Sequence, residues 1–252
     1  MTTVAVLCDP PRPGLVLPSL VESSPLTEQE VSDLYAAMLR DVVAAVEASG
    51  AELLVNYRPD EALPEGGASG AEGATAEAEV RAVVRDALRD PDAARFEVQV
   101  GETFAGRVRN TLTHLLDGEG VTTAAAVEPT VPLLQRSHVD NAAMKLRSSA
   151  TVLGPATGGR VYYAGFADPV DYADAYAPPA VETLTDRALD VDHDVDYLPM
   201  LPVVETGADL AEVLTLLRAR RRAGRLVPEH TTGCLDDLGL AVVVEDGLQL
   251  TR

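Results

Sequence analysis

Apolar residues follow one another along this chain in two patterns: short unbroken runs, and longer stretches in which they recur every three to four positions. The runs at residues 3–8 and 52–57 have the length and composition of buried strands. Between them, Thr27 and Glu30 have the spacing of a helix capping box, and the apolar face that follows them ends at Gly50. This order predicts two parallel strands joined by a helical crossover.

The alternation of strand and helix patterns continues along the chain. Further strands are predicted at residues 95–100, 122–127, 150–153 and 160–164. Further helices are predicted near residues 79–89, 105–116 and 137–146, and from Thr206 onward. Two apolar runs, 240–244 and 248–250, flank Asp246-Gly247 and predict a hairpin.

These elements predict the α/β class, a three-layer sandwich with a mostly parallel central sheet, helices on both faces and a small C-terminal hairpin. We expect one domain over residues 1–226, with residues 227–252 as a helix and hairpin appendage. Residues 64–78 are rich in Gly, Ala, Glu and Ser without apolar periodicity, which predicts a flexible surface insertion.

The strongly negative net charge limits the kinds of partner that this protein is expected to bind. The 252 residues hold 40 acidic and 20 basic side chains, a formal net charge of -20, and Lys145 is the only lysine. An acidic surface repels nucleic acid, and the one basic cluster (residues 218–225) ends a predicted helix, where cations complement the helix dipole. We therefore expect no nucleic-acid partner and a protein from a halophile. An acidic partner-binding surface is the alternative, although the charge is spread along the whole chain.

The cysteines and the hydropathy pattern exclude several other classes. Cys8 and Cys234 are far apart and in no metal-type spacing, so neither a disulfide framework nor a zinc site is indicated. The apolar run at residues 3–8 is too short for a signal sequence, and no run reaches membrane-spanning length. We expect a cytoplasmic protein, with no indication of its oligomeric state.

Several motifs, in order, resemble those of one known family. The matching segments are residues 11–14, 26–41, 99–108, 128–134, 152–165 and 201–210. Together they resemble the uncharacterised bacterial and archaeal family DUF2064, described as glycosyltransferase-A-like (GT-A-like), over about residues 4–217. The resemblance implies a GT-A/Rossmann-like nucleotide-diphospho-sugar transferase fold, in a divergent halophilic archaeal member. It also implies a nucleotide or nucleotide-sugar ligand and a divalent cation, Mg²⁺ or Mn²⁺.

The resemblance implies nucleotide contacts in the first loop and in the helix that begins near residue 105. Pro11 and Gly14 match the loop, but apolar and small residues replace the family's Lys and Arg in the segment that follows. A phosphate bound there relies on backbone N–H donors and on metal. Arg107 matches an arginine position and is a candidate phosphate ligand. A solvent-exposed arginine in the first helical turn is an equal alternative.

The family's two loop acids are both replaced in this chain. Thr130 stands at the first acid position, and Glu128, two residues earlier on the same face of a strand, is a candidate metal ligand in its place. Gly158 stands at the second. The resemblance still implies nucleotide binding by Thr130 and by the loop residues Gly154, Pro155, Thr157 and Gly158.

Glu205 is the other candidate metal ligand, because it keeps a carboxylate in the last matching segment. Its alternative role is simply to precede a helix cap formed by Thr206 and Asp209.

Two hypotheses follow for the function. The first is metal-assisted transfer of a sugar or nucleotidyl group from a nucleotide-activated donor. The second is a catalytically degraded relative that acts as a nucleotide-binding or regulatory module. An acidic scaffold without a small ligand is a third, weaker alternative.

Overall fold

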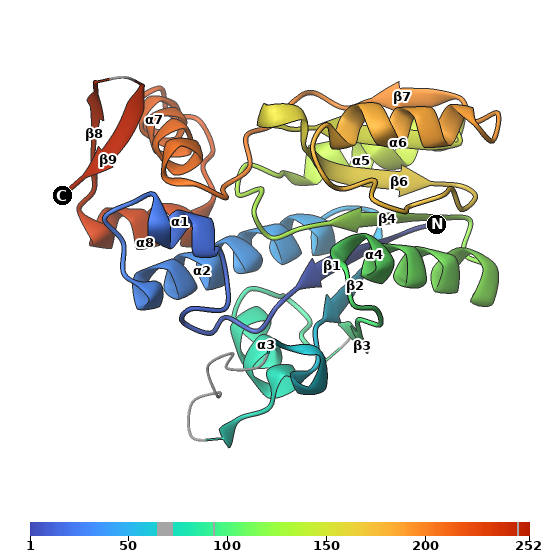
Figure 1. Cartoon of the computed structure of the whole chain (residues 1–252), viewed down its shortest axis with the longest axis horizontal. Helices are drawn as coiled ribbons and strands as arrows, with labels where there is room; N and C mark the ends of the chain where they lie inside the picture. Colours follow the sequence, from blue (N-terminus) through green and yellow to red (C-terminus); the bar gives the residue numbers. More distant parts are fainter. Residues whose placement is uncertain (65–72, 93, 246) are drawn as a thin grey trace.

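A seven-stranded sheet forms the middle layer of the computed structural model, which describes residues 1–64, 73–92, 94–245 and 247–252 (Figure 1). Its strands are β1 (Thr2–Cys8), β2 (Glu52–Tyr57), β3 (Arg95–Val98), β4 (Thr123–Val127), β5 (Thr151–Pro155), β6 (Val161–Phe166) and β7 (Val195–Tyr197). They lie in the order β3-β2-β1-β4-β6-β5-β7. β6 runs antiparallel to its neighbours β4 and β5, and the other neighbouring pairs are parallel. The predicted α/β class with a mostly parallel sheet is confirmed.

The strand order reverses between β1 and β4. The chain adds β2 and β3 on one side of β1 and then returns to place β4 on the other side. Loops that leave two such strands turn in opposite directions, so they open a crevice at the carboxyl ends of the strands. Asp9 follows β1, Gln99 lies just beyond β3 and Glu128 follows β4, so all three lie at this edge. Because β6 is reversed, Arg160 enters the same edge from the other direction.

One face of the sheet is covered by α2 (Glu28–Glu47), α3 (Ala76–Arg85) and α5 (Arg136–Lys145). The predicted capping box is present: Oγ1 of Thr27 accepts from the N–H of Glu30, and the Glu30 carboxylate accepts from the N–H of Thr27. The apolar side of α2 is buried against β1 and β2, which explains why its sequence pattern was so regular.

The opposite face is covered by α4 (Phe104–Thr113), the π-helical turn η3 (His114–Gly118) and α6 (Ala180–Leu189). Leu112 of α4, Leu115 of η3 and Leu184 of α6 are fully buried in this second core. The two cores on either side of the sheet make the predicted three-layer arrangement.

The C-terminal segment packs on α2 through its helix α8, and its hairpin packs on its own helix α7. It consists of α7 (Gly207–Arg222), α8 (Glu229–Leu238) and the hairpin strands β8 (Ala241–Val244) and β9 (Leu248–Thr251). The Asp41 carboxylate of α2 accepts from the N–H groups of His230 and Thr231 at 3.1 and 2.7 Å, so it caps α8. The predicted hairpin is present, with Asp246 outside the described residues.

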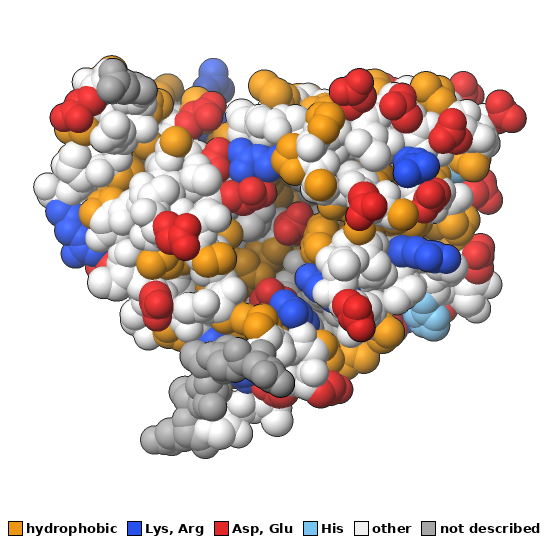
Figure 2. Space-filling view, in the orientation of Figure 1, with side chains coloured by type: hydrophobic (Ala, Val, Ile, Leu, Met, Phe, Trp, Pro, Cys, Tyr) orange, Lys and Arg blue, Asp and Glu red, His pale blue; other side chains and the backbone are white. Residues whose placement is uncertain are grey.

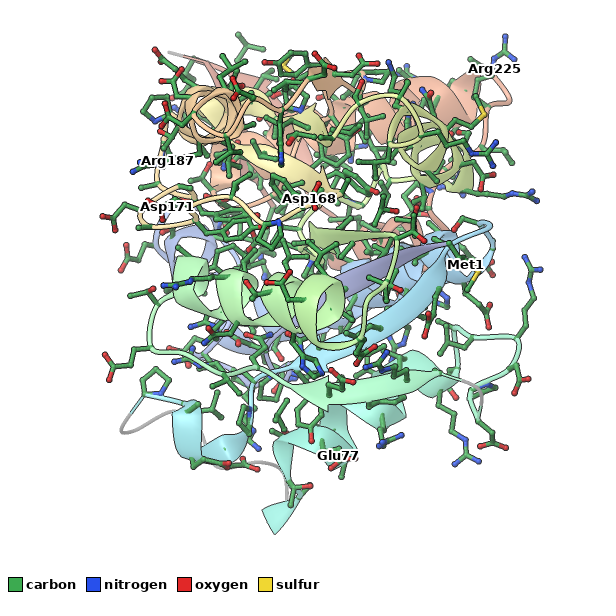
Figure 3. All side chains as sticks on the ribbon, turned by 90° about the vertical axis from the view of Figure 1, so that its right-hand side faces the viewer. Met1, Glu77, Asp168, Asp171, Arg187 and Arg225 are labelled. Carbon is green, nitrogen blue, oxygen red and sulfur yellow. The ribbon has the colours of Figure 1, made fainter. Side chains whose placement is uncertain are left out.

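Some elements differ from the sequence prediction. α3 begins at Ala76, capped by Thr75, so the last residues of the segment 64–78 are helical, while residues 65–72 lie outside the described part. The short helices α1 (Pro18–Glu22), η1 (Asp60–Ala62) and η4 (Thr157–Gly159), together with α6 and β7, were not predicted. α6 is held to the preceding loop by Arg187, whose guanidinium lies 3.4 Å from the Asp171 carboxylate (Figure 3).

Among the described residues, no helix is both long and apolar enough to cross a membrane.

Candidate functional site

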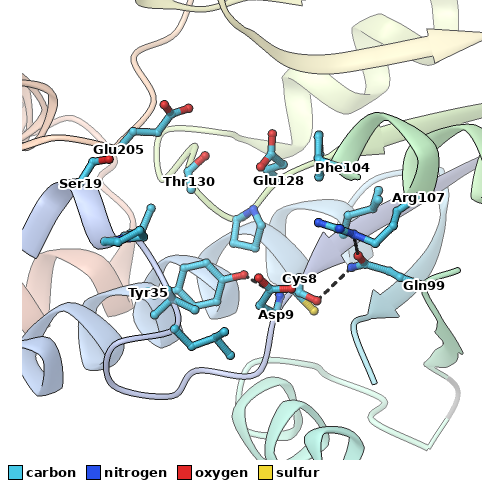
Figure 4. Close-up of a pocket in the computed structure, with 16 residues that line it drawn as sticks. Cys8, Asp9, Ser19, Tyr35, Gln99, Phe104, Arg107, Glu128, Thr130 and Glu205 are labelled. Atoms are coloured by element: carbon cyan, nitrogen blue, oxygen red, sulfur yellow. Dashed lines mark hydrogen bonds between the residues drawn. The ribbon is translucent and has the colours of Figure 1, made fainter. Parts of the chain in front are cut away.

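A cavity of about 290 Å³ opens where the loops after β1 and β4 diverge. In Figure 2 it is visible as a hollow near the centre of the molecule, with hydrophobic side chains inside and charged ones at its rim. Apolar residues 15–18, the start of α1, α4 and the segment before α7 complete the walls (Figure 4). This is the position at which open α/β sheets bind their ligands.

Arg107 is the fixed cation of the cavity. It is 8% exposed, and its Nε donates to Oε1 of Gln99 at 2.7 Å. The Gln99 amide donates in turn to the carbonyls of Cys8 and Asn56 at 3.0 and 2.8 Å. Every polar atom of the Gln99 side chain is therefore engaged, which holds the guanidinium in one orientation.

Burial lowers the pKa of Arg107, and the neighbouring carboxylates of Asp9 and Glu128 oppose this effect. Neither carboxylate is within 4.0 Å, and among the described residues Arg107 forms no ion pair. A buried guanidinium without a counter-ion favours an anionic ligand.

Asp9 is held at the end of β1 by two contacts. Its N–H donates to the hydroxyl of Tyr35 at 3.0 Å, and its carboxylate lies 3.7 Å from the guanidinium of Arg58. Burial raises the pKa of Asp9, while Arg58 and Arg107 oppose the rise. Tyr35 comes from α2, so the long helix directly fixes the first loop of the site.

Glu128 follows β4 and lines the cavity. Burial, reinforced by the negative charges of Glu205 and Asp9, raises its pKa to about 8. The carboxyl group is therefore mostly protonated at neutral pH, and in this form it is able to donate as well as accept a hydrogen bond.

Glu205 lies at the cavity rim and pairs with Arg160, with Oε2 3.0 Å from NH1. Arg160 also pairs with Asp209 at 2.6 Å, and Asp209 is the capping-box residue of α7. Glu205 thus immediately precedes the N-cap of α7, as the alternative role requires. Its side chain also reaches the cavity.

The structure brings four of the predicted site residues to the cavity: Arg107, Thr130, Glu128 and Glu205. Thr130 is buried, and its carbonyl accepts from the N–H of Val204 at 2.8 Å, which holds the segment before α7.

The other predicted nucleotide contacts lie outside the cavity walls: Pro11, Gly14, Gly154, Pro155, Thr157 and Gly158. The Pro11 carbonyl accepts from the Ser32 hydroxyl at 2.6 Å. Gly154 is packed under the Tyr162 ring, where an added Cβ would lie 2.6 Å from a ring carbon. Thr157 accepts from Arg160, and Gly158 has a φ of 71° that suits a turn.

Sequence reasoning missed Asp9, Gln99 and Tyr35 as site residues. Asp9 was visible as the polar residue that ends the first strand, in the same position as Glu128 after β4. Gln99 and Tyr35 lay in matched motifs, but no pattern indicated which way their side chains point.

The acids of the cavity do not form a ready divalent-metal site. Asp9, Glu128 and Glu205 line it, yet in the described part of the chain the only group of three acidic or histidine ligand atoms within 4.8 Å is Glu97, His114 and Glu119. That group lies at the β3 edge, and Arg95 already pairs with both of its carboxylates. These acids therefore do not form a preassembled divalent-cation site, and a cation there would also need ligand oxygens from a bound nucleotide.

Solved structures of other proteins share this fold. No protein-family model matches the sequence, and no curated protein matches it. A protein of Desulfovibrio desulfuricans G20, assigned provisionally as a nucleotide-diphospho-sugar transferase, matches with a TM-score of 0.71 at 18% identity, over 94% of this chain and 95% of that one. This likeness establishes the GT-A-like, nucleotide-diphospho-sugar transferase fold of the chain.

Two further solved structures resemble the chain less closely. A cytidylyltransferase of Leptospira borgpetersenii matches with a TM-score of 0.49 at 8% identity, over 94% of this chain and 93% of that one. Rv0371c of Mycobacterium tuberculosis, in complex with manganese, matches with a TM-score of 0.47 at 15% identity, over 85% of this chain and 98% of that one.

Proposed function

We propose that this protein binds a nucleotide or nucleotide-sugar in the cavity at the carboxyl ends of β1 and β4. The observation that carries the proposal is Arg107, a buried guanidinium fixed by Gln99, which forms no ion pair among the described residues. Phosphate is the anion that such a planar donor group suits. The apolar wall at Val16 and Leu17 offers a surface for the base or sugar ring.

The ordered motifs and the fold support a second part of the proposal, that the chain is a divergent relative of DUF2064. Its departures from the motifs fall at charged positions, where Thr130 and Gly158 replace acids. Proteins that share a fold differ in the reactions they catalyse, because the reaction depends on charged side chains such as those replaced here.

Of the two hypotheses for activity, the geometry supports the nucleotide-binding or regulatory module better. Metal-assisted transfer by Glu128 and Glu205 requires a metal, whereas the described acids of the cavity form no preassembled metal site and Glu205 is already paired with Arg160. A transferase that works without metal is a second candidate, favoured by Glu128, because a carboxyl group with a pKa of about 8 is suited to proton transfer near neutral pH.

The proposal is tested by thermal stabilisation with the four ribonucleoside diphosphates and their sugar conjugates. We expect one of them to raise the melting temperature of the wild-type protein and to leave the Arg107→Gln variant unchanged. Arg109→Gln is the matched control, because Arg109 is exposed on the same helix. Equal stabilisation of wild type and Arg107→Gln would contradict the assignment of the phosphate contact. Absence of any stabilisation would contradict nucleotide binding altogether.

A further inference from the structure

Most acids around the cavity already have a guanidinium partner in the absence of a ligand. Two of the three acids that line it have a guanidinium partner: Arg58 lies 3.7 Å from Asp9, and Arg160 lies 3.0 Å from Glu205. A carboxylate that neutralises an arginine is a weaker ligand for a cation, because the cation must first displace the guanidinium.

Arg160 is an anchored residue and not a loose surface side chain. Its Nε donates to the carbonyl of Thr157 at 2.8 Å, and NH2 donates to Oδ1 of Asp209 at 2.6 Å. The side chain of Arg160 is 16% exposed, and that of Asp209 is 12% exposed. The hydrogen bond that Arg160 donates to Asp209 raises the pKa of Arg160 despite burial, so the guanidinium stays charged.

Asp209 is equally fixed on its own side. Its carboxylate accepts from the N–H and the hydroxyl of Thr206 at 3.0 and 2.9 Å, as the capping box of α7 requires. Burial works to raise the pKa of Asp209, but the hydrogen bonds from Arg160 and Thr206 outweigh it and lower the pKa. Arg160 therefore links the loop after β5 to the start of α7, and Glu205 pairs with the same guanidinium.

The fixed charges near the cavity balance without a metal ion. Asp9, Glu205 and Asp209 face Arg58, Arg160 and Arg107, and among these arginines only Arg107 has no ion-pair partner in the described part of the chain. Arg160 pairs with two of the acids, so Arg107 is left outside these ion pairs, and its direction is fixed by Gln99.

We propose that the cavity binds the phosphate of its nucleotide without a divalent cation. Arg107 is the cation that binds the phosphate, and Arg160, instead of a metal ion, neutralises the carboxylate of Glu205. This inference rests on the proposed nucleotide binding. It departs from the Mg²⁺ or Mn²⁺ dependence that the family resemblance implies.

The first test is calorimetric titration of the wild-type protein with the stabilising nucleoside diphosphate, in EDTA and in Mn²⁺. We expect the dissociation constants to agree within about twofold. Binding that occurs in Mn²⁺ and is lost in EDTA would overturn the inference while leaving nucleotide binding intact. Failure to bind in both buffers would overturn the proposed function, and this inference with it.

The second test creates the metal site instead of removing it. Arg160→Gln releases the carboxylate of Glu205 and Oδ1 of Asp209. We therefore expect this variant to bind one Mn²⁺ at least tenfold more tightly than wild type, measured from the free-Mn²⁺ signal in electron paramagnetic resonance. Arg136→Gln, which breaks the exposed pair with Asp140, should leave Mn²⁺ binding unchanged. Tight Mn²⁺ binding by the wild-type protein, equal to that of Arg160→Gln, would overturn the inference, and a tenfold gain in Arg136→Gln would do the same.

Discussion

Oε1 of Gln99 accepts the Nε–H of Arg107 at 2.7 Å, and this buried contact joins the end of β3 to the first turn of α4. The same amide also holds the carboxyl ends of β1 and β2 through the carbonyls of Cys8 and Asn56. The side chain of Gln99 therefore joins three neighbouring strands and one helix, and it fixes the orientation of the Arg107 guanidinium toward the cavity.

Replacing Gln99 with leucine should weaken nucleotide binding as well as the fold. The change frees the guanidinium of Arg107 and removes one donor from each of the carbonyls of Cys8 and Asn56, although the Cys8 carbonyl still accepts from the N–H of Arg58 at 3.0 Å. Each lost hydrogen bond costs about 0.5–1.5 kcal/mol of stability. We expect the nucleotide dissociation constant to rise at least tenfold, measured by calorimetric titration. Gln29→Leu on exposed α2 surface is the control, and an equal loss in both variants would contradict the role of Gln99.

The hydroxyl of Tyr35 should contribute to stability through one buried hydrogen bond. Tyr35→Phe keeps the ring but removes the acceptor for the N–H of Asp9, so the free energy of unfolding should fall by about 1–3 kcal/mol. Urea denaturation measures this change. In the wild-type protein, the Tyr197 hydroxyl forms an exposed hydrogen bond with the Thr185 hydroxyl. Tyr197→Phe should therefore change the free energy of unfolding by less than about 0.5 kcal/mol.

Glu128 should make the protein less stable as the pH rises. Its pKa is about 8 in the folded chain against an ordinary value of 4.5, so between these values the folded state holds a proton that the unfolded state has lost. Stability from this group is complete below about pH 4.5 and declines until about pH 8, by at most ~1.4 kcal/mol per pH unit.

Glu128→Gln removes that titration. We expect the variant to be more stable than wild type at pH 8, to approach it at pH 5, and to show a flatter pH dependence in urea denaturation. A constant difference between the two proteins across this range would mean that the pKa of Glu128 is not raised.

Asp41 should hold the C-terminal segment by capping α8. Asp41→Ala removes the acceptor for two N–H groups, and we expect a loss of about 1–2 kcal/mol together with faster amide exchange in α8. Asp41→Asn keeps a capping oxygen and should retain most of the protection. Loss of protection in both variants to the same extent would show that the charge, and not the cap, holds α8.

The elements that could be predicted from the sequence are those with local signals. α2 carries its own start signal in Thr27 and Glu30, three residues apart, and a continuous apolar face. The strands β1 and β2 each contain a short apolar run, residues 4–8 and 53–55, because a central parallel strand is buried on both faces. β7 has no such signal, since it is a short edge strand with polar, partly exposed residues.

The site depends on contacts between distant parts of the chain, which is why less of it could be predicted. Gln99 and Cys8 are 91 residues apart in sequence, and Arg160 and Asp209 are 49 apart. Motif positions located Arg107, Glu128 and Glu205, but which of these carboxylates has a guanidinium partner is settled only by the fold. The sequence also did not indicate that the small size of Gly154 accommodates the Tyr162 ring.

The central claim is that Arg107 binds the phosphate of a nucleotide in the cavity between β1 and β4. The most direct measurement is the dissociation constant of the stabilising nucleoside diphosphate for wild type, Arg107→Gln and Arg109→Gln, by calorimetric titration in EDTA. The account predicts binding by wild type and Arg109→Gln and at least a tenfold weaker affinity for Arg107→Gln. Equal affinities in all three proteins would contradict it.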